Sequence, residues 1–469
     1  MKKKILLVRP PCPGAQHVNW PPLGLCCLAA YLEARDPEVS LKAIDFAVEK
    51  FSQDRWRREL EMYQPGILGI SVLSLDAPHG VEMARLAKEV DPGILTVCGG
   101  AHATDASELC VDHYDVVVQG EGEETFYEIV QGHALGGIKG ICYRQDGELV
   151  TNPQRPVIRD LDGLPPPLYS LFDMEQYIEG DFRLGAVLGS RGCPYECTFC
   201  ASQVFWERSI RLRSVEKVTD EVEFMQEKYR FDKISFADDL VNVPRQRAID
   251  LANEIIKRRL HKKVEFYSLI RANKNTVSEE MFERMKEANW KEVSFGIESA
   301  SPRVLAAMNK NLTPKEASQA IAMARKAGIE TVYGNFIICS WDAGWSDVFK
   351  TWWFVLTNDV EPLFWVCTPY PGTKLSENLI NAGYLDRDYA WIAKIRPGSF
   401  VPIARTNRMS KLEIQVAYFI SVALQLMVYT LRSKNRGLIR YFGRRALAEL
   451  WGKVERALVP SKRRSPYAR

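Results

Sequence analysis

The stretch "RGCPYECTFC", residues 191–200, is the starting point for interpreting the chain, because it places three cysteines on one short segment. Cys193, Cys197 and Cys200 are separated by three and then two residues. Iron–sulfur clusters are held by cysteine thiolates, and three protein ligands would leave one iron of a four-iron cluster open. A closed zinc site needs four ligands. Zinc with a distant fourth ligand stays open as the alternative, since the next Cys or His is more than 50 residues away.

The composition is that of a folded protein with two or three domains and reduced thiols. The chain has 469 residues, of which 46% are hydrophobic and 26% charged. Its eleven cysteines are scattered without the paired spacing of a secreted disulfide framework. The first apolar run, Ile5–Val8, is too short for a signal peptide. The most membrane-like run, 416–431, is interrupted by Gln425, so we expect a cytoplasmic protein.

The N-terminal third alternates short β-rich runs with helical patterns. The β-rich runs lie at 4–10, 40–46, 67–73, 94–100 and 116–120. Apolar strands that alternate with helices predict a doubly wound parallel sheet, which binds ligands at the carboxyl ends of its strands. Glycines at those ends let a ligand approach the backbone closely. The candidate ligand contacts are Ser71, Gly99, Gly100, His102, Gly120 and Glu121. His102 could equally be a loop histidine that only bonds its surroundings.

The cysteine loop and the 200 residues around it resemble the radical S-adenosylmethionine (SAM) enzymes. The resemblance rests on "GSRG" before Cys193, on Phe199, and on "RLRSVEKVTDEV" (211–222), "ISFADDL" (234–240), "YSLIRAN" (267–273), "VSFGIESASPRVLAAMNKNLT" (293–313) and "YPGTKL" (370–375). It implies a partial (β/α)6 barrel of the TIM type, with its active site at the carboxyl ends of the strands. It also implies that the three cysteines hold a 4Fe-4S cluster whose open iron binds SAM. Reductive cleavage of SAM would then give a 5′-deoxyadenosyl radical.

Five residues near the predicted strand ends are candidates for contact with SAM. They are Phe199, Asp238, Asp239, Arg271 and Glu298. Each charged residue among them could instead form an ordinary ion pair at the rim of the barrel. After "YGNFIICS" the chain departs from the family pattern and has four tryptophans between 341 and 353, which predict a bulky apolar wall.

The two halves together resemble the cobalamin-dependent branch of that family. The stretches "NWPPLGL" (19–25), "GGAHAT" (99–104) and "GEGEETF" (120–126) look like that branch, although no D-x-H-x-x-G supplies an axial histidine to cobalt. The resemblance implies an α/β chain with a Rossmann-like cobalamin-binding domain (1–135), a linker (136–180), a radical SAM barrel (181–405) and a basic helical C-terminal region (406–469).

The resemblance implies two alternative functions, and a third function of a different class is the rival to both. The first is radical methyl transfer from methylcobalamin to an unactivated carbon. The second is oxidation or cyclisation of a large hydrophobic substrate, such as a tetrapyrrole or a lipid. The third is a cobalamin-binding sensor with a structural cluster. An enzyme of this kind needs a small-molecule substrate and an electron donor such as flavodoxin or ferredoxin.

Positive charge is concentrated at the C-terminus. Residues 431–469 hold twelve Lys/Arg against two acidic residues, a net +10, while the rest of the chain carries −7. Apolar residues recur there at three- and four-residue steps, at Leu438, Tyr441, Phe442, Ala446, Leu450 and Trp451. This pattern predicts a basic amphipathic helix, which is either a lid on the barrel or a peripheral contact with the inner face of the membrane. No RNA-binding module is evident, and we expect no nucleic-acid partner.

Overall fold

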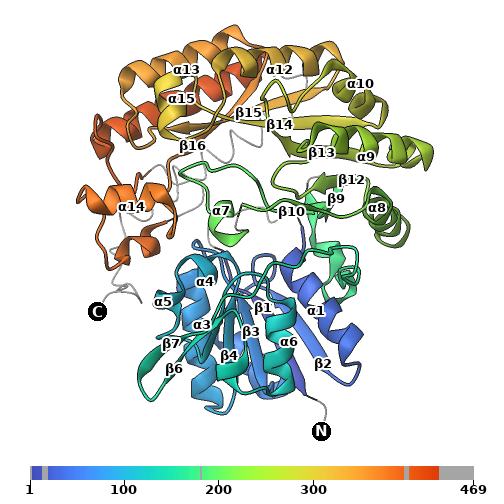
Figure 1. The fold of residues 1–469 in the computed structure, drawn as a ribbon, viewed down its shortest axis with the longest axis vertical. Helices are drawn as coiled ribbons and strands as arrows, with labels where there is room; N and C mark the ends of the chain where they lie inside the picture. Colours follow the sequence, from blue (N-terminus) through green and yellow to red (C-terminus); the bar gives the residue numbers. More distant parts are fainter. Residues whose placement is uncertain (1–2, 13–19, 180–181, 207, 396–400, 433–469) are drawn as a thin grey trace.

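The computed structural model of the chain describes residues 3–12, 20–179, 182–206, 208–395 and 401–432. Two α/β domains are stacked along the long axis, with the N-terminal domain at the bottom of Figure 1 and the barrel above it. All eleven cysteines lie in the described segments and are free thiols. The α/β fold class expected from the sequence is confirmed.

The first domain is a doubly wound sheet. Among the described residues its strand order is β2-β1-β3-β4-β5-β6-β7, and the first five strands are parallel. The strands are β1 (Lys4–Arg9), β2 (Ser40–Asp45), β3 (Ile67–Ser71), β4 (Leu95–Gly99), β5 (Val116–Val118), β6 (Ile141–Gln145) and β7 (Glu148–Thr151). Because side chains alternate along a strand, Ile5 and Leu7 of β1 enter one core while Leu6 and Val8 enter the other.

Helices cover both faces of this sheet. Helices α1 (Leu23–Arg35) and α6 (Glu123–Gln131) share a core on one face, and α2 (Gln53–Tyr63) and α3 (Ala77–Val90) share a core on the other. The short helices α4 (Ala101–Asp105) and α5 (Ser107–Cys110) lie between β4 and β5. The carboxyl ends of the parallel strands therefore remain open to the barrel domain.

The segment expected as a linker is packed against both domains. Strands β6 and β7 lie within it and pair antiparallel with β5 and with each other, so the first sheet continues past residue 135. Farther along, the Leu168 amide donates to the Cys26 carbonyl of α1 at 3.0 Å. The Tyr177 hydroxyl donates to Asp45 Oδ2 of β2 at 2.7 Å.

The second domain is an open barrel. Its strand order among the described residues is β16-β15-β14-β13-β12-β9-β8, with six parallel strands and an antiparallel β8 (Ile178–Glu179) at the edge. The parallel strands are β9 (Phe182–Val187), β12 (Lys233–Phe236), β13 (Glu265–Ile270), β14 (Trp290–Glu298), β15 (Thr331–Ile338) and β16 (Glu361–Val366). The helices between them are α8 (Val215–Tyr229), α9 (Arg245–Lys257), α10 (Glu279–Glu287), α11 (Pro302–Ala307), α12 (Pro314–Lys326) and α13 (Trp345–Thr357).

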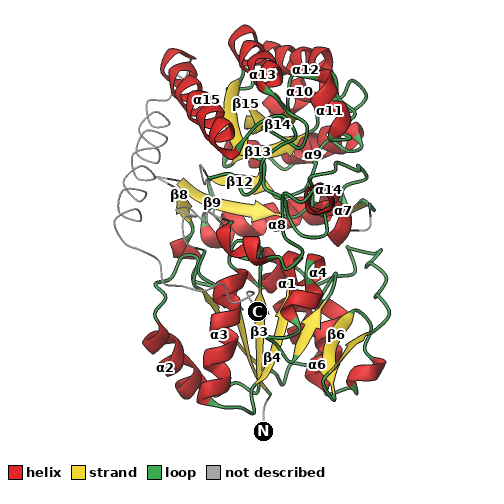
Figure 2. Cartoon of the chain, turned by 90° about the vertical axis from the view of Figure 1, so that its left-hand side faces the viewer, coloured by secondary structure: helices red, strands yellow, loops and turns green. Residues whose placement is uncertain are grey.

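In the part of the chain that the structure describes, two α-helices follow the last strand. Helix α14 (Lys374–Asn381) belongs to the barrel in sequence, but its Leu375 and Leu379 join the core beneath α3 of the first domain. Helix α15 (Lys411–Arg432) packs on β15, β16 and α13, in the place of the helix that follows the sixth strand (Figure 2). By length and composition α15 could cross a membrane, but 39% of its apolar stretch is buried in the protein. The basic helix expected farther on lies outside the described residues.

Candidate active site between the two domains

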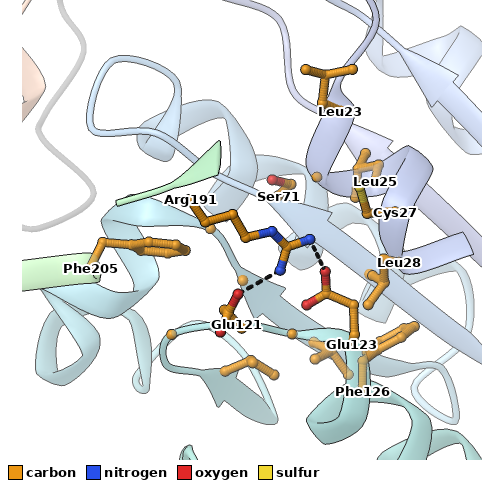
Figure 3. Close-up of a pocket in the computed structure, with 18 of the residues that line it drawn as sticks. Leu23, Leu25, Cys27, Leu28, Ser71, Glu121, Glu123, Phe126, Arg191 and Phe205 are labelled. Atoms are coloured by element: carbon orange, nitrogen blue, oxygen red, sulfur yellow. Dashed lines mark hydrogen bonds and ion pairs between the residues drawn. The ribbon is translucent and has the colours of Figure 1, made fainter. Parts of the chain in front are cut away.

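A cavity of about 320 Å³ lies where the first sheet faces the barrel. The first domain supplies most of its wall, from the start of α1 and from the carboxyl ends of β3, β4 and β5. The barrel closes the other side with Leu188, Arg191, Phe205, Trp206 and Ala237. Figure 3 shows Arg191 and Phe205 opposite the apolar side chains of α1. The cavity is therefore shared by the two domains.

Most residues predicted to contact a ligand in the first domain line this cavity. Ser71, Gly99, Gly100, Gly120 and Glu121 are part of its wall. His102 is not: it is fully buried, and its Nδ1 lies 3.0 Å from the Ser74 hydroxyl oxygen. Helix α4 begins at Ala101, and its buried side carries His102 into the protein interior. The sequence reasoning missed the wall formed by α1, although it had singled out the segment "NWPPLGL".

The glycines show how a large ligand fits against this wall. Gly100 has φ +97°, and a Cβ there would lie 2.8 Å from the Val72 carbonyl oxygen, so only glycine is tolerated without strain. Gly24 and Gly120 also line the cavity, and a Cβ at either position would meet no atom within 4 Å. Side chains at these two positions would take space that a ligand can use. The cavity wall suits a cofactor that lies close to the backbone.

Arg191 connects the cavity to the cysteine loop. Its Nη1 donates to Glu121 Oε1 and its Nη2 to Glu123 Oε1, both at 2.6 Å (Figure 3). Arg211 Nη1 donates to the second oxygen of Glu121 at 2.7 Å. All four side chains are buried. Because breaking a buried ion pair leaves an uncompensated charge, these contacts hold the barrel in register with the first domain.

The three cysteines lie on the loop that follows β10 (Ser190–Arg191). Cys197 is buried, while Cys193 and Cys200 are half-buried. Gly192 has φ +93°, and a Cβ there would overlap the Ser209 carbonyl oxygen at 1.9 Å. Burial raises the pKa of Cys193 and raises that of Cys200 to about 12. A bound iron would favour the thiolate forms, so these thiols fit a metal cluster.

A single-metal site does not appear in the described part of the chain. No three Cys, His, Asp or Glu side chains there are arranged to hold one metal ion. The three cysteines lie on one loop, and their thiols would serve as the cluster ligands that the sequence predicts.

Arg271 and Asp239 flank the cysteine loop, as the sequence predicted. The Arg271 guanidinium lies over the Tyr195 ring, 3.5 Å from its centroid, and its Nη1 is 4.0 Å from Cys197 Sγ. Asp239 accepts a hydrogen bond from the Ser202 hydroxyl at 2.8 Å. Arg271 places positive charge beside the predicted cluster ligands.

Glu298 forms a buried ion pair on the same side of the barrel. It ends β14 with φ +68°, and its Oε1 accepts from Lys310 Nζ at 2.8 Å. Lys310 Nζ also lies 5.9 Å from the centroid of Phe199, just before Cys200. Lys310 stands in the segment "MNKNLT", but the sequence pattern did not mark it as a site residue. The structure thus brings Phe199, Glu298 and the missed Lys310 together.

Asp238 is turned away from this group. It is buried, and its Oδ1 accepts hydrogen bonds from the backbone amide and the hydroxyl of Ser190. Burial raises its pKa to about 6, although the Ser190 hydrogen bonds act in the opposite direction. In this structure Asp238 fixes the start of the cysteine loop.

The four tryptophans do not form the single wall that the sequence predicted. Trp341 packs against Tyr384, with ring centroids 6.1 Å apart. Trp345 and Trp352 pack between α13 and α15, whereas Trp353 is exposed on the outer surface. Trp341 precedes α13, and Trp353 directly follows Trp352, so its side chain points to a different side of the helix.

Comparison with known protein families agrees with this geometry. The Radical SAM superfamily matches residues 187–340 and the B12 binding domain matches residues 17–130. The first match contains the cysteine loop, and the second contains most of the first-domain cavity wall. The chain therefore uses a 4Fe-4S cluster, SAM and cobalamin, which confirms the cofactors expected from the sequence.

Individual relatives cover most of the chain. An uncharacterized methyltransferase from Pyrococcus horikoshii is 35% identical over 80% of this chain and 83% of that protein. An anaerobic magnesium-protoporphyrin IX monomethyl ester cyclase from Rubrivivax gelatinosus is 30% identical over 67% of this chain and 58% of its own length. The radical SAM methyltransferase TsrM from Kitasatospora setae shares the fold, with a TM-score of 0.70 at 17% identity, covering 81% of this chain and 76% of its own. The chain therefore belongs to the cobalamin-binding radical SAM enzymes.

Proposed function

We propose that the chain transfers a methyl group to an unactivated carbon of a large hydrophobic small molecule. The observation that carries this proposal is the shared cavity, because Arg191 lies on its wall and is two residues from Cys193. When bound, the cluster and SAM supply a 5′-deoxyadenosyl radical, and methylcobalamin supplies the methyl group. Both sites meet at the boundary of the two domains, so one substrate can reach both.

The barrel residues would hold the cluster and SAM. Cys193, Cys197 and Cys200 would ligate the cluster, with Arg271 stabilising its negative charge. Asp239 has a second carboxylate oxygen beside the one that bonds Ser202, and it could accept from the amino group of SAM. The Glu298–Lys310 pair offers one partner of each charge next to Phe199. Asp238 would act on SAM only indirectly, by fixing the loop through Ser190.

The first domain would hold cobalamin mainly through backbone and apolar contacts. Ser71, Gly99, Gly100 and Gly120 form the strand-end side of the cavity. Glu121 would act by anchoring Arg191 rather than by touching the cofactor. His102 is buried beside Ser74, away from the cavity, so we do not propose it as a ligand of cobalt.

Apolar groups support a hydrophobic substrate. Burial raises the pKa of Tyr370, which lies in the loop after β16. Trp341 lies partly buried in the core that also contacts Phe199 and Cys367. These apolar side chains beside Phe199 of the cysteine loop would suit a hydrophobic substrate and would help to exclude water.

The cyclase-type reaction is the second candidate, and the match to the Rubrivivax cyclase favours it. Either reaction needs an electron donor such as flavodoxin or ferredoxin. A cytoplasmic location suits eleven free thiols. Membrane contact through the basic C-terminal helix concerns residues outside those described.

The decisive experiment uses the full chain, reconstituted anaerobically with its cluster and hydroxocobalamin. It is incubated with a strong reductant and methyl-deuterated SAM, and products are identified by mass spectrometry. Deoxyadenosine, S-adenosylhomocysteine and labelled methylcobalamin together would support methyl transfer. Deoxyadenosine alone would favour the cyclase-type reaction. The Cys197→Ala variant is the control and should form no deoxyadenosine, while Cys142→Ala, at a buried cysteine of the first domain, should match the wild type.

A further inference from the structure

Helices α13 and α15 lie side by side on the part of the barrel far from the first domain (Figures 1 and 2). They run parallel, as two hydrogen bonds show. Trp352 Nε1 donates to the Ser421 hydroxyl at 2.8 Å, and Arg432 Nη2 donates to the Leu356 carbonyl at 2.9 Å. The two helices therefore present one fixed surface.

That surface is strongly apolar. Of the seventeen exposed large hydrophobic residues among the described residues, nine lie on these two helices. They recur at three- and four-residue steps, so each helix carries an outward stripe. We call this surface the α13–α15 face; it consists of Phe349, Trp353, Leu356, Leu412, Val416, Phe419, Ile420, Met427 and Leu431. Exposed apolar patches of this kind mark interaction sites.

The distribution of charged residues around the α13–α15 face indicates the kind of partner that the face fits. In α15 the charged residues are confined to the ends, at Lys411, Glu413 and Arg432. The sequence that follows, 433–469, holds eleven Lys/Arg against two Glu. An apolar face with aromatic residues, continued by a strongly cationic segment, matches a membrane surface that carries anionic headgroups.

We propose that the α13–α15 face docks on an anionic lipid surface, with its apolar side chains at the boundary between headgroups and acyl chains. Helix α15 lies on the membrane surface and does not cross it, because its inner side packs against the barrel. Ile414, Ala417 and Val428 are buried there, and the Tyr429 hydroxyl donates to the Pro362 carbonyl at 3.0 Å. This proposal does not depend on the reaction that the enzyme catalyses.

Two other occupants fit less well. A second copy docked through the same face would bring two cationic 433–469 segments together, and like charges repel. The second alternative is that segment 433–469 covers the face of its own chain. Its eleven basic residues would then find only two acidic residues on α13 and α15, which are Asp347 and Glu413. Asp347 is already bonded to Ser301 and Arg303.

Vesicle flotation of the full-length, cobalamin-loaded protein tests the proposal. Vesicles of phosphatidylcholine alone are compared with vesicles containing about 30 mol% phosphatidylglycerol. We expect at least about ten-fold more protein to float with the anionic vesicles, and we expect added salt to reduce this binding. The triple variant Trp353→Glu, Leu412→Glu, Leu431→Glu should lose it, because these side chains are 68%, 69% and 75% exposed.

Two controls separate loss of the apolar face from a general effect of added charge and from misfolding. Met62→Glu, at a 78% exposed apolar residue of α2 in the other domain, should bind as the wild type does. A wild-type iron content and retention of cobalamin through gel filtration show that each variant is folded, and Trp353→Glu alone serves if the triple variant is not. Equal flotation of wild type and folded variant, or no flotation, would overturn the proposal. The proposal would also be overturned if the wild type formed a dimer that the variant did not form. The same holds if vesicle binding appeared only after residues 433–469 were removed.

Discussion

Different types of residue stand at the carboxyl ends of the strands in the two parallel sheets. Where they line the cavity, the strand ends of the first domain offer glycines and a small hydroxyl, at Ser71, Gly99, Gly100 and Gly120. In the barrel the corresponding ends offer charged side chains that are buried and paired, such as Glu298 with Lys310. Both sheets follow the rule that ligands bind beyond the carboxyl ends of parallel strands.

The difference reflects the size and charge of what each site holds. A corrin cofactor is large, so its site must leave volume and bring the backbone close. SAM and the cluster are smaller and charged, so their site must supply charges that are already held in place. Added volume should therefore damage the first site, and altered charge should damage the second.

The largest effect should come from breaking the buried pair in the barrel. In Glu298→Gln, Lys310 loses its charged partner while the shape of the side chain is kept. Because an uncompensated buried charge is costly, we expect the rate of reductive SAM cleavage to fall at least about ten-fold. The measurement is deoxyadenosine formed per cluster, with iron content and cobalamin binding measured on the same sample.

Glu292→Gln is the matched control. Glu292 lies on the same strand, near its opposite end, and pairs with Lys233 at 2.9 Å. It should keep the wild-type rate. If Glu298→Gln cleaves SAM as fast as Glu292→Gln does, the charged strand ends of the barrel do not serve the cofactor, and the contrast between the two sheets fails.

A smaller but selective effect should follow from filling the first site. Gly24 lies on α1 and lines the cavity, and a Cβ there meets no atom within 4 Å. We expect Gly24→Leu to weaken cobalamin binding about ten-fold, because the side chain would take space that the cofactor uses. Cofactor retention through gel filtration and a binding titration measure the effect.

The control for added volume is Gly137→Leu. Gly137 is exposed, a Cβ there would also meet no atom within 4 Å, and the residue lies away from the cavity. Cobalamin affinity should be unchanged in this variant. Equal losses at both positions would mean that the fold, and not the cavity, had been disturbed.

Local patterns in the sequence sufficed for the strands and for the cysteine loop. The spacing of Cys193, Cys197 and Cys200 predicted the cluster loop, and apolar runs followed by polar residues predicted Asp239, Arg271 and Glu298 at strand ends. The positions of those residues can be predicted from local sequence, because the carboxyl ends of all the parallel strands lie at the same rim of the barrel.

The same local patterns could not predict contacts between residues that are far apart in the sequence. Arg191 and Glu123 meet across the domain boundary, and Lys310 reaches Glu298 from the next helix and loop. Such pairs depend on how whole domains and helices pack. His102 and Asp238 show a related limit: a polar residue near a strand end can turn inward to bond Ser74 or Ser190, and sequence alone does not show which way it turns.

The smallest effect on cofactor binding is expected at Asp76, a polar residue of the first domain that contributes to the stability of the fold. Asp76 is buried at the start of α3, and its Oδ1 accepts from the Leu73 amide at 2.7 Å. Burial raises its pKa to about 7, against the hydrogen bond from Leu73 and the charge of His102. The folded state thus binds a proton that the unfolded state releases near pH 4, so stability falls as pH rises from about 4 to 7.

Asp76→Asn keeps the acceptor oxygen and removes the charge. The stability of this variant minus that of the wild type should be larger at pH 8 than at pH 5. The difference should be at most about 3 kcal/mol, which is about 1.4 kcal/mol for each of the two pH units between pH 5 and the raised pKa. The check is the difference in melting temperature between the two proteins at each pH, which cancels the titration of all other groups. Cobalamin affinity should not change, because Asp76 does not line the cavity. A loss of affinity with no pH-dependent gain in stability would make Asp76 part of the ligand site, and the first sheet would then use charge as the barrel does.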